Sequence, residues 1–176
     1  GLGDVVHGLP VANALKRAGA AHLTWVAEPA PSWIVRPHPA IDDVVVYHKK
    51  RGLSGIAQLA RDLRGHDFDV TLNLNIYFKS VWPTVLSRAP RRIGFDRARS
   101  RDGVWLFATE HLNSRPRAHT QDMFLEFLEH LHIGAYTRAT PGTQGRESDA
   151  VQSDAPLEWK ITFTAREREA QHGYFE

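Results

Sequence analysis

The strongest constraint on the fold is a regular alternation between short β-rich runs and segments with helical periodicity. The β-rich runs occupy residues 22–28, 42–48, 68–75 and 91–95. Helical patterns separate or follow them at residues 54–65, 76–89 and 119–134. Such alternation is typical of βαβ units, in which crossover helices join parallel strands. The sequence therefore predicts an α/β fold: a Rossmann-like parallel sheet with helices on both faces.

The opening segment, GLGDVVHGLPVANALKRAG, predicts a glycine-rich loop that runs into a helix. Pro10 suits the first turn of that helix and Gly19 suits its end. A glycine loop of this kind normally follows the first central strand of the sheet. No strand pattern precedes Gly1, so we expect the first strand to be missing and a groove to remain in its place.

Composition divides the chain into three parts. Residues 1–134 hold the alternating pattern and predict one domain. Residues 135–157 are poor in large apolar side chains and rich in small, polar and proline residues, which indicates a linker. Residues 158–176 contain WKITF at 159–163, which favours extended structure, and continue into a charged helical pattern from Thr164. We interpret this last part as the start of a truncated C-terminal region.

Several classes of chemistry are disfavoured by residue content and spacing. The chain has no cysteine, which excludes disulfides, a thiol nucleophile and cysteine-bound zinc. His130 and His132 are only two apart on a predicted helix and do not share a face, and no His-Glu-x-x-His spacing occurs. The sequence therefore predicts no metal site. No apolar run approaches the roughly 18 residues of a membrane span.

Charge is unevenly distributed, and its distribution indicates an anionic ligand. Residues 88–118 carry eight arginines against three acidic residues, whereas residues 119–176 have a net charge of −5. An anion would be steered to the arginine-rich stretch. This stretch has no motif that reads a nucleic-acid groove, so nucleic acid is not expected. An anionic small molecule or a lipid headgroup fits, and a solvated surface is the alternative.

The glycine loop itself allows two functional interpretations. Gly1, Gly3 and Gly8, followed at a distance by Glu28, favour dinucleotide binding. The third glycine is out of place for that motif, however, and Asp4 stands where a pyrophosphate would bind. A carboxylate at the carboxyl edge of a parallel sheet instead suits a general base that accepts a proton from a bound hydroxyl. The structural alternative is that Asp4 only caps a helix.

Six segments occur in the order GLGDVVHGLPVANALKRAG, TWVAEP, DDVVVYHKK, DVTLNLNIYFKS, RRIGFDRARSRD and HTQDMFLEFL. Together, in this order, they resemble glycosyltransferase family 9, the bacterial lipopolysaccharide heptosyltransferases. The resemblance covers about residues 1–134, and the first segment contributes most to it.

The resemblance implies a protein of two Rossmann-like domains, the GT-B arrangement, of which this chain would be the N-terminal, acceptor-binding half. The missing C-terminal half would bind the nucleotide sugar, usually ADP-heptose. Asp4 corresponds to the family's catalytic base in a metal-independent, inverting transfer that needs no cofactor. The implied acceptor is the anionic inner core of lipopolysaccharide, reached by peripheral contact at the cytoplasmic face of the inner membrane.

The resemblance also implies a set of acceptor-binding residues, in loops after the predicted strands and at the start of the last helix. They are Gly3, His7, Lys49, Lys50, Arg51, Lys79, Ser80, Arg97, Arg99, Arg101 and His119. Two alternatives remain open at this stage. One is a dinucleotide-binding oxidoreductase domain, and the other is a non-catalytic fragment that binds anionic glycolipid.

Overall fold

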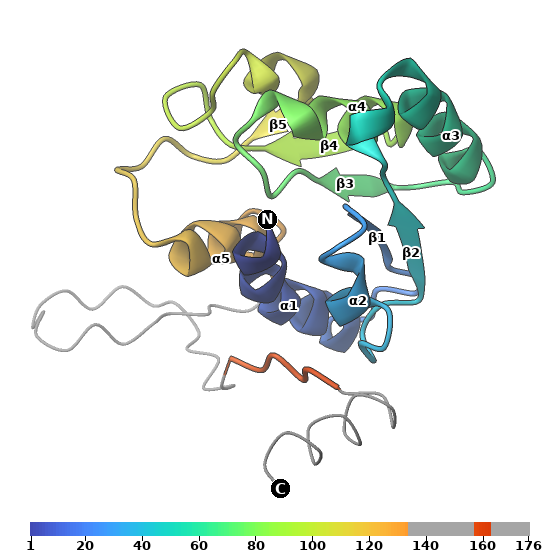
Figure 1. Cartoon of the computed structure of the whole chain (residues 1–176). Coiled ribbons are helices and arrows are strands. Elements are labelled where there is room, and N and C mark those ends of the chain that lie inside the picture. Colours follow the sequence, from blue (N-terminus) through green and yellow to red (C-terminus); the bar gives the residue numbers. More distant parts are fainter. Residues whose placement is uncertain (134–156, 163–176) are drawn as a thin grey trace, which may run out of the picture.

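The computed structural model describes residues 1–133 and 157–162, and these form an α/β fold in which every strand pair is parallel (Figure 1). The helices are α1 (Leu2–Arg17), α2 (Ser32–Val35), α3 (Leu53–Leu63), α4 (Val81–Leu86) and α5 (Thr120–His130). The strands are β1 (Thr24–Ala27), β2 (Asp43–Val46), β3 (Val70–Leu72), β4 (Arg91–Gly94) and β5 (Glu110–His111). Short 3₁₀ turns lie at Lys49–Arg51, Phe78–Ser80 and Val104–Phe107. The predicted fold class is confirmed.

The strands form two separate sheets with a slot between them. β1 pairs with β2, and β3, β4 and β5 pair in that order. β1 and β3 face each other across a cavity of about 910 Å³, which is lined by residues 24–27 on one side and 70–74 on the other. The slot lies where the sequence predicts a groove between neighbouring parallel strands.

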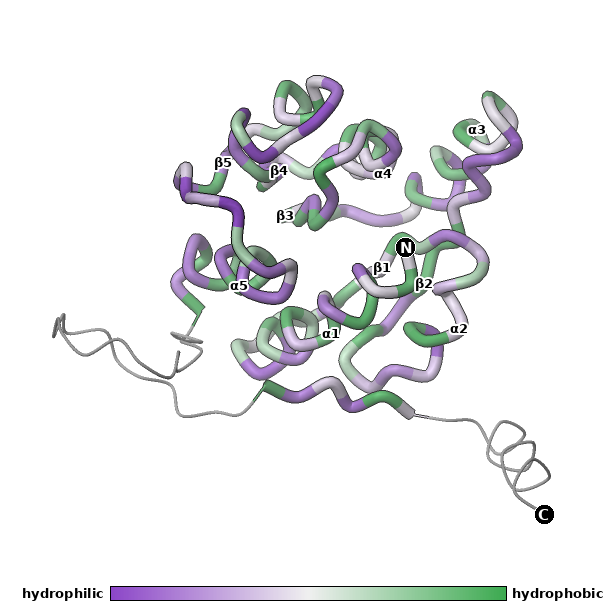
Figure 2. The backbone as a smooth tube through the Cα atoms, turned by 60° about the vertical axis from the view of Figure 1, so that its left-hand side comes forward, coloured by the Kyte–Doolittle hydropathy of each residue, from purple (hydrophilic) through white to green (hydrophobic). Residues whose placement is uncertain are grey.

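Helices cover both faces of the sheets because side chains alternate along each strand. Trp25 and Ala27 of β1 pack toward α1 and α2, whereas Val26 packs toward α3. α1, α2 and α5 lie on one face, with α1 beside α5 in both views, and α3 and α4 lie on the other (Figures 1 and 2).

The predicted glycine loop is wrong, because α1 begins at Leu2 and contains both Gly3 and Gly8. Pro10 lies inside the helix rather than in its first turn. Packing explains the glycine at position 8. A Cβ there would stand 2.7 Å from Cη2 of Trp25 and 3.2 Å from Cδ1 of Leu74, which is closer than atoms approach. Gly8 therefore lets α1 lie directly on the two sheets.

The segment 157–162 is extended but forms no strand, and it packs against α1 and the turn after α2. The Asn13 amide donates a hydrogen bond of 2.5 Å to the Glu158 carbonyl, and Nε2 of the buried His38 donates one of 2.8 Å to the Trp159 carbonyl. The predicted linker and the predicted helix from Thr164 lie almost entirely outside the described residues.

Candidate active site

Asp4 lies in the first turn of α1, at the carboxyl edge of the sheets. Its side chain is 48% exposed, and its Oδ2 is 2.7 Å from the Gly1 nitrogen. Asp4 lines the same cavity as Glu28, Asn75, Lys79 and Ser80, which follow β1 and β3. Helix N-termini stabilise negative charge through their free amide groups. The carboxylate is thus placed to receive a proton in a crevice that a ligand can enter.

His7 and His119, which are far apart in the sequence, meet beside Asp4. His7 is one turn further along α1, and its ring contacts the His119 ring edge-to-face with centroids 5.3 Å apart. The buried Gln121 of α5 joins this helix to α1. Its amide donates a 3.0 Å hydrogen bond to the His7 carbonyl, and its Oε1 lies 3.2 Å from Nδ1 of His7. Sequence reasoning missed Gln121 because a glutamine in a helical pattern carries no signal of its partner.

Two of the predicted lysines converge on one carboxylate. Lys49, in the turn after β2, and Lys79, after β3, lie 2.8 Å and 3.4 Å from the Glu28 carboxylate at the end of β1. Burial alone would raise the pKa of Glu28, but the hydrogen bonds and charges of the two lysines outweigh it and leave the pKa below its ordinary value. The site therefore holds two cations around one anion before any ligand binds.

This arrangement removes the support for dinucleotide binding. Glu28, the acidic residue that would bind a ribose, is ion-paired with Lys49 and Lys79. Gly3 and Gly8 lie in a helix and do not form a phosphate-binding loop. Both features on which the alternative depended have other roles in the structure.

Of the remaining predicted residues, Ser80 lines the same cavity as Asp4, whereas Lys50, Arg51, Arg97 and Arg101 do not line it. Ser80 Oγ donates to the Tyr77 carbonyl at 2.8 Å, and the exposed Lys50 and Arg51 share a turn with Lys49. The Arg97 guanidinium lies over the Trp105 ring, 5.4 Å from its centroid. Arg101 lines a second, smaller cavity of about 380 Å³ together with Arg115 and Arg117.

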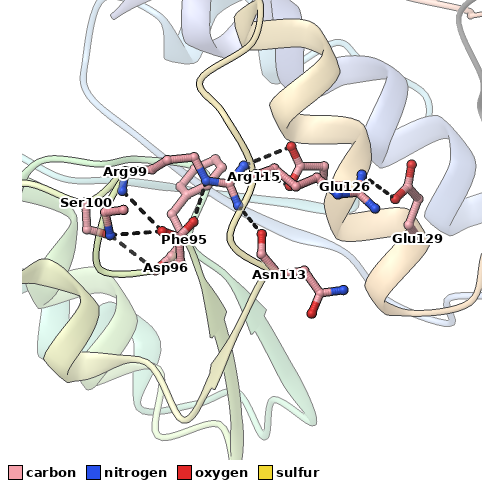
Figure 3. A network of polar contacts seen from close by, with 9 residues as sticks. Phe95, Asp96, Arg99, Ser100, Asn113, Arg115, Glu126 and Glu129 are labelled. Atoms are coloured by element: carbon pink, nitrogen blue, oxygen red, sulfur yellow. Dashed lines mark hydrogen bonds and ion pairs between the residues drawn. The ribbon is translucent and has the colours of Figure 1, made fainter.

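Arg99 is the exception, because the structure buries it. Its side chain is 3% exposed, and its guanidinium pairs with Asp96 and, at 2.8 Å, with both oxygens of Glu126 on α5 (Figure 3). A further guanidinium nitrogen donates to the Asn113 carbonyl at 2.9 Å. Because these donors pair inside the protein, Arg99 has a structural role, and its predicted contact with the acceptor stays a prediction that its burial disfavours. An arginine in a basic run does not reveal in the sequence which acidic residues will enclose it.

Comparison with known proteins agrees with this fold. The model of glycosyltransferase family 9 (heptosyltransferase) matches residues 56–167. The lipopolysaccharide core heptosyltransferase OpsX of Haemophilus influenzae is 29% identical over 133 residues, which are 75% of this chain and 38% of that protein.

Solved structures show the same fold at lower identity. A glycosyl transferase of family 9 from Veillonella parvula superposes with a TM-score of 0.65 at 23% identity, over 84% of this chain and 43% of that one. The E. coli heptosyltransferase WaaC with ADP-2-deoxy-2-fluoro heptose also gives 0.65, at 19% identity, over 78% of this chain and 48% of that one.

The fold and the site thus define a glycosyltransferase-type α/β domain with a carboxylate at its crevice. The chain belongs to glycosyltransferase family 9. It spans less than half the length of the relatives that it matches. Within the described ranges, no helix has both the length and the apolar character needed to cross a bilayer.

Proposed function

We propose that this chain forms the acceptor-binding part of a heptosyltransferase that transfers a heptose from ADP-heptose to the inner core of lipopolysaccharide. Family membership and the similarity to OpsX and WaaC support the reaction class. The observation that carries the proposal is the position of Asp4, which faces the same crevice as Lys79 and Ser80 at the carboxyl edge of the sheets.

In the proposed reaction, an acceptor hydroxyl lies within hydrogen-bond reach of Asp4. The carboxylate takes the proton while the hydroxyl oxygen forms a bond to the anomeric carbon of the heptose. The bond from that carbon to the diphosphate breaks on the opposite face, and the diphosphate leaves with the electron pair. The configuration at the anomeric carbon is inverted, and no metal takes part. A second domain supplies the donor site and stabilises the leaving group.

His7 and His119 would contact the acceptor beside Asp4, with Gly3 at the edge of the same turn. Gln121 fixes both histidines, so that helix α5 positions part of the site on α1. The peripheral approach to the inner membrane would follow from binding an acceptor that is part of a lipid.

Lysines and arginines around the crevice suit an acceptor that carries carboxylates and phosphates. Glu28 holds Lys49 and Lys79 at the crevice, and an acceptor carboxylate would compete with Glu28 for them. Lys50, Arg51, Arg97 and Arg101 add positive charge around this centre. Arginine binds a carboxylate through two parallel hydrogen bonds, which makes the three arginines suitable ligands for acidic sugars.

Titration calorimetry of the chain with an inner-core oligosaccharide that contains Kdo tests the acceptor role. We expect Lys79→Ala to weaken binding at least about tenfold, since a charge-assisted hydrogen bond contributes roughly 1.5–3 kcal/mol. Arg64→Ala removes an exposed charge from the end of α3, which leads into the start of β3 and so lies at the opposite edge of the sheets from Lys79, and it should leave the affinity unchanged. Equal weakening by both variants would show that only net charge matters and would contradict the proposed site.

A further inference from the structure

The amino-terminal edge of the sheets, opposite the Asp4 site, holds a second cluster of functional side chains. His22 precedes β1 by two residues, Asp43 is the first residue of β2, and His66 lies between α3 and β3. One imidazole nitrogen from each histidine and one Asp43 oxygen all lie within 4.8 Å of one another. Their separation in the sequence hides this cluster from any analysis of histidine spacing.

We propose that His22, Asp43 and His66 bind a divalent first-row transition ion, with zinc as the best match. Two imidazoles and one carboxylate are a known zinc ligand set, which leaves a fourth position for water. Zn–N and Zn–O bonds of about 2.0–2.2 Å in a tetrahedron place the ligand atoms about 3.4 Å apart. The separations between the atoms of this cluster therefore need to change by no more than about 1.4 Å.

The individual contacts show a partly organised site. Nε2 of His22 and Oδ2 of Asp43 are already 2.8 Å apart, so a metal would replace a shared proton between them. The His66 ring stacks on Phe68 with centroids 5.3 Å apart, which limits its orientations, and its centroid is 6.3 Å from that of His22. His22 is 54% exposed, so its ring has room to turn toward a bound ion.

The surroundings favour a cation. Asp67 and Asp69 follow His66 in the sequence and line the same cavity as the three ligands. Thr24, next to the cluster on β1, has a buried Oγ1 with no hydrogen-bond partner among the described residues. A metal-bound water would offer this hydroxyl a partner.

The position of the cluster suggests a structural role. His22 and Asp43 belong to the β1–β2 sheet, whereas His66 leads into the β3–β4–β5 sheet, and these two sheets are not paired with each other. An ion held by all three residues would clamp the sheets together across the slot. His22 and Glu28 stand six residues apart along β1, about 20 Å at roughly 3.3 Å per residue, so the ion would not touch the proposed transfer chemistry.

Calorimetric titration of the EDTA-stripped full chain with ZnCl2 at pH 7.5, without a histidine tag, tests the proposal. We expect one equivalent of zinc to bind and to raise the melting temperature, and Co2+ to give the absorption spectrum of a nitrogen and oxygen ligand set. His66→Ala and His22→Ala should each lower the zinc affinity at least about tenfold.

The control is His132→Asn, which alters an exposed histidine outside the cluster, in a left-handed conformation that asparagine tolerates. It should bind zinc like the parent chain. Asp43→Asn keeps the shape of the ligand and provides a second variant if an alanine variant unfolds, which circular dichroism would reveal. Absence of binding in the parent, or binding that survives all three ligand substitutions, would overturn the proposal.

Discussion

Gly8 shows how one residue sets the distance between α1 and the sheets. A methyl group at this position would meet Trp25 and Leu74 in the core. We expect Gly8→Ala to lower the free energy of unfolding by about 1–3 kcal/mol, the usual cost of overpacking. Urea denaturation measures the change.

Gly3 supplies the matched control for Gly8, because it lies in the same helix and a Cβ there has no atom within 4 Å. Gly3→Ala should raise stability by about 0.5–1 kcal/mol through the higher helix propensity of alanine. A destabilisation of equal size in both variants would contradict the packing explanation.

Arg99 is the residue whose removal should harm the fold most. Arg99→Ala leaves Asp96 and Glu126 as buried carboxylates without their partner, which costs about 3–5 kcal/mol. Arg97→Ala removes only a stacking contact with Trp105 and should cost less than about 1 kcal/mol. Thermal and urea unfolding distinguish the two. A stable Arg99→Ala variant with lost acceptor binding would restore the role that the sequence predicted.

Glu110 makes stability depend on pH. Paired hydrogen bonds from Arg91, and a further one from His130, lower the pKa of Glu110 to about 2. A carboxyl whose pKa is lower in the folded state stabilises the fold above its unfolded pKa, ordinarily about 4.5, and loses this contribution as pH falls toward 2. We expect Glu110→Gln to flatten the fall in unfolding free energy between pH 4.5 and 2. An unchanged slope would show that other carboxyls dominate.

At the scale of elements, the slot between β1 and β3 leaves two strand edges facing each other. Unpaired strand edges are open to a further strand. A variant with five added residues before Gly1, rich in valine and isoleucine, should therefore be more stable. We expect its free energy of unfolding to rise by at least about 1 kcal/mol, which raises the melting temperature by roughly 2–4 °C for a chain of this size. A glycine–serine extension of equal length is the control. Equal melting temperatures would show that the slot does not accept a strand.

The elements also show what the sequence can reveal. The β-rich runs at 22–28, 42–48, 68–75 and 91–95 each contain a strand, because β-branched residues bounded by turn residues are a local signal. The start of α1 could not be found in this way. Its glycines and proline are locally typical of a loop, and only the contact with Trp25 shows why Gly8 stands inside a helix. Tertiary packing decides there against local propensity.

The candidate site could be predicted in part, from the segments that resemble a known family. Asp4, His7, Lys79 and His119 came from segments with a family resemblance, and the structure places Asp4 and Lys79 in one crevice and joins His7 to His119. The pairing of Lys49 and Lys79 with Glu28, and the burial of Arg99, depend on contacts between distant segments. No local pattern encodes such contacts.

At the scale of the whole molecule, the described residues form one crevice-bearing domain, with the segment 157–162 fastened to it. This segment binds α1 through Asn13 and the turn after α2 through His38. Residues 157–162 therefore lie against the domain that residues 1–133 form. In the proposed enzyme, this connection would set where a donor-binding half meets the Asp4 crevice.

The most direct test of the central claim is the rate of heptose transfer by the longest reading frame that contains this chain, with ADP-heptose and a Kdo–lipid A acceptor. We expect transfer by the parent protein and a loss of about 10²–10⁴-fold in kcat for Asp4→Asn, with acceptor binding retained. Asp62→Asn, on the exposed side of α3, should transfer at the parental rate. Full activity of the Asp4→Asn protein would contradict the assignment of the base, and acceptor binding by the parent without any transfer would contradict the proposed enzyme.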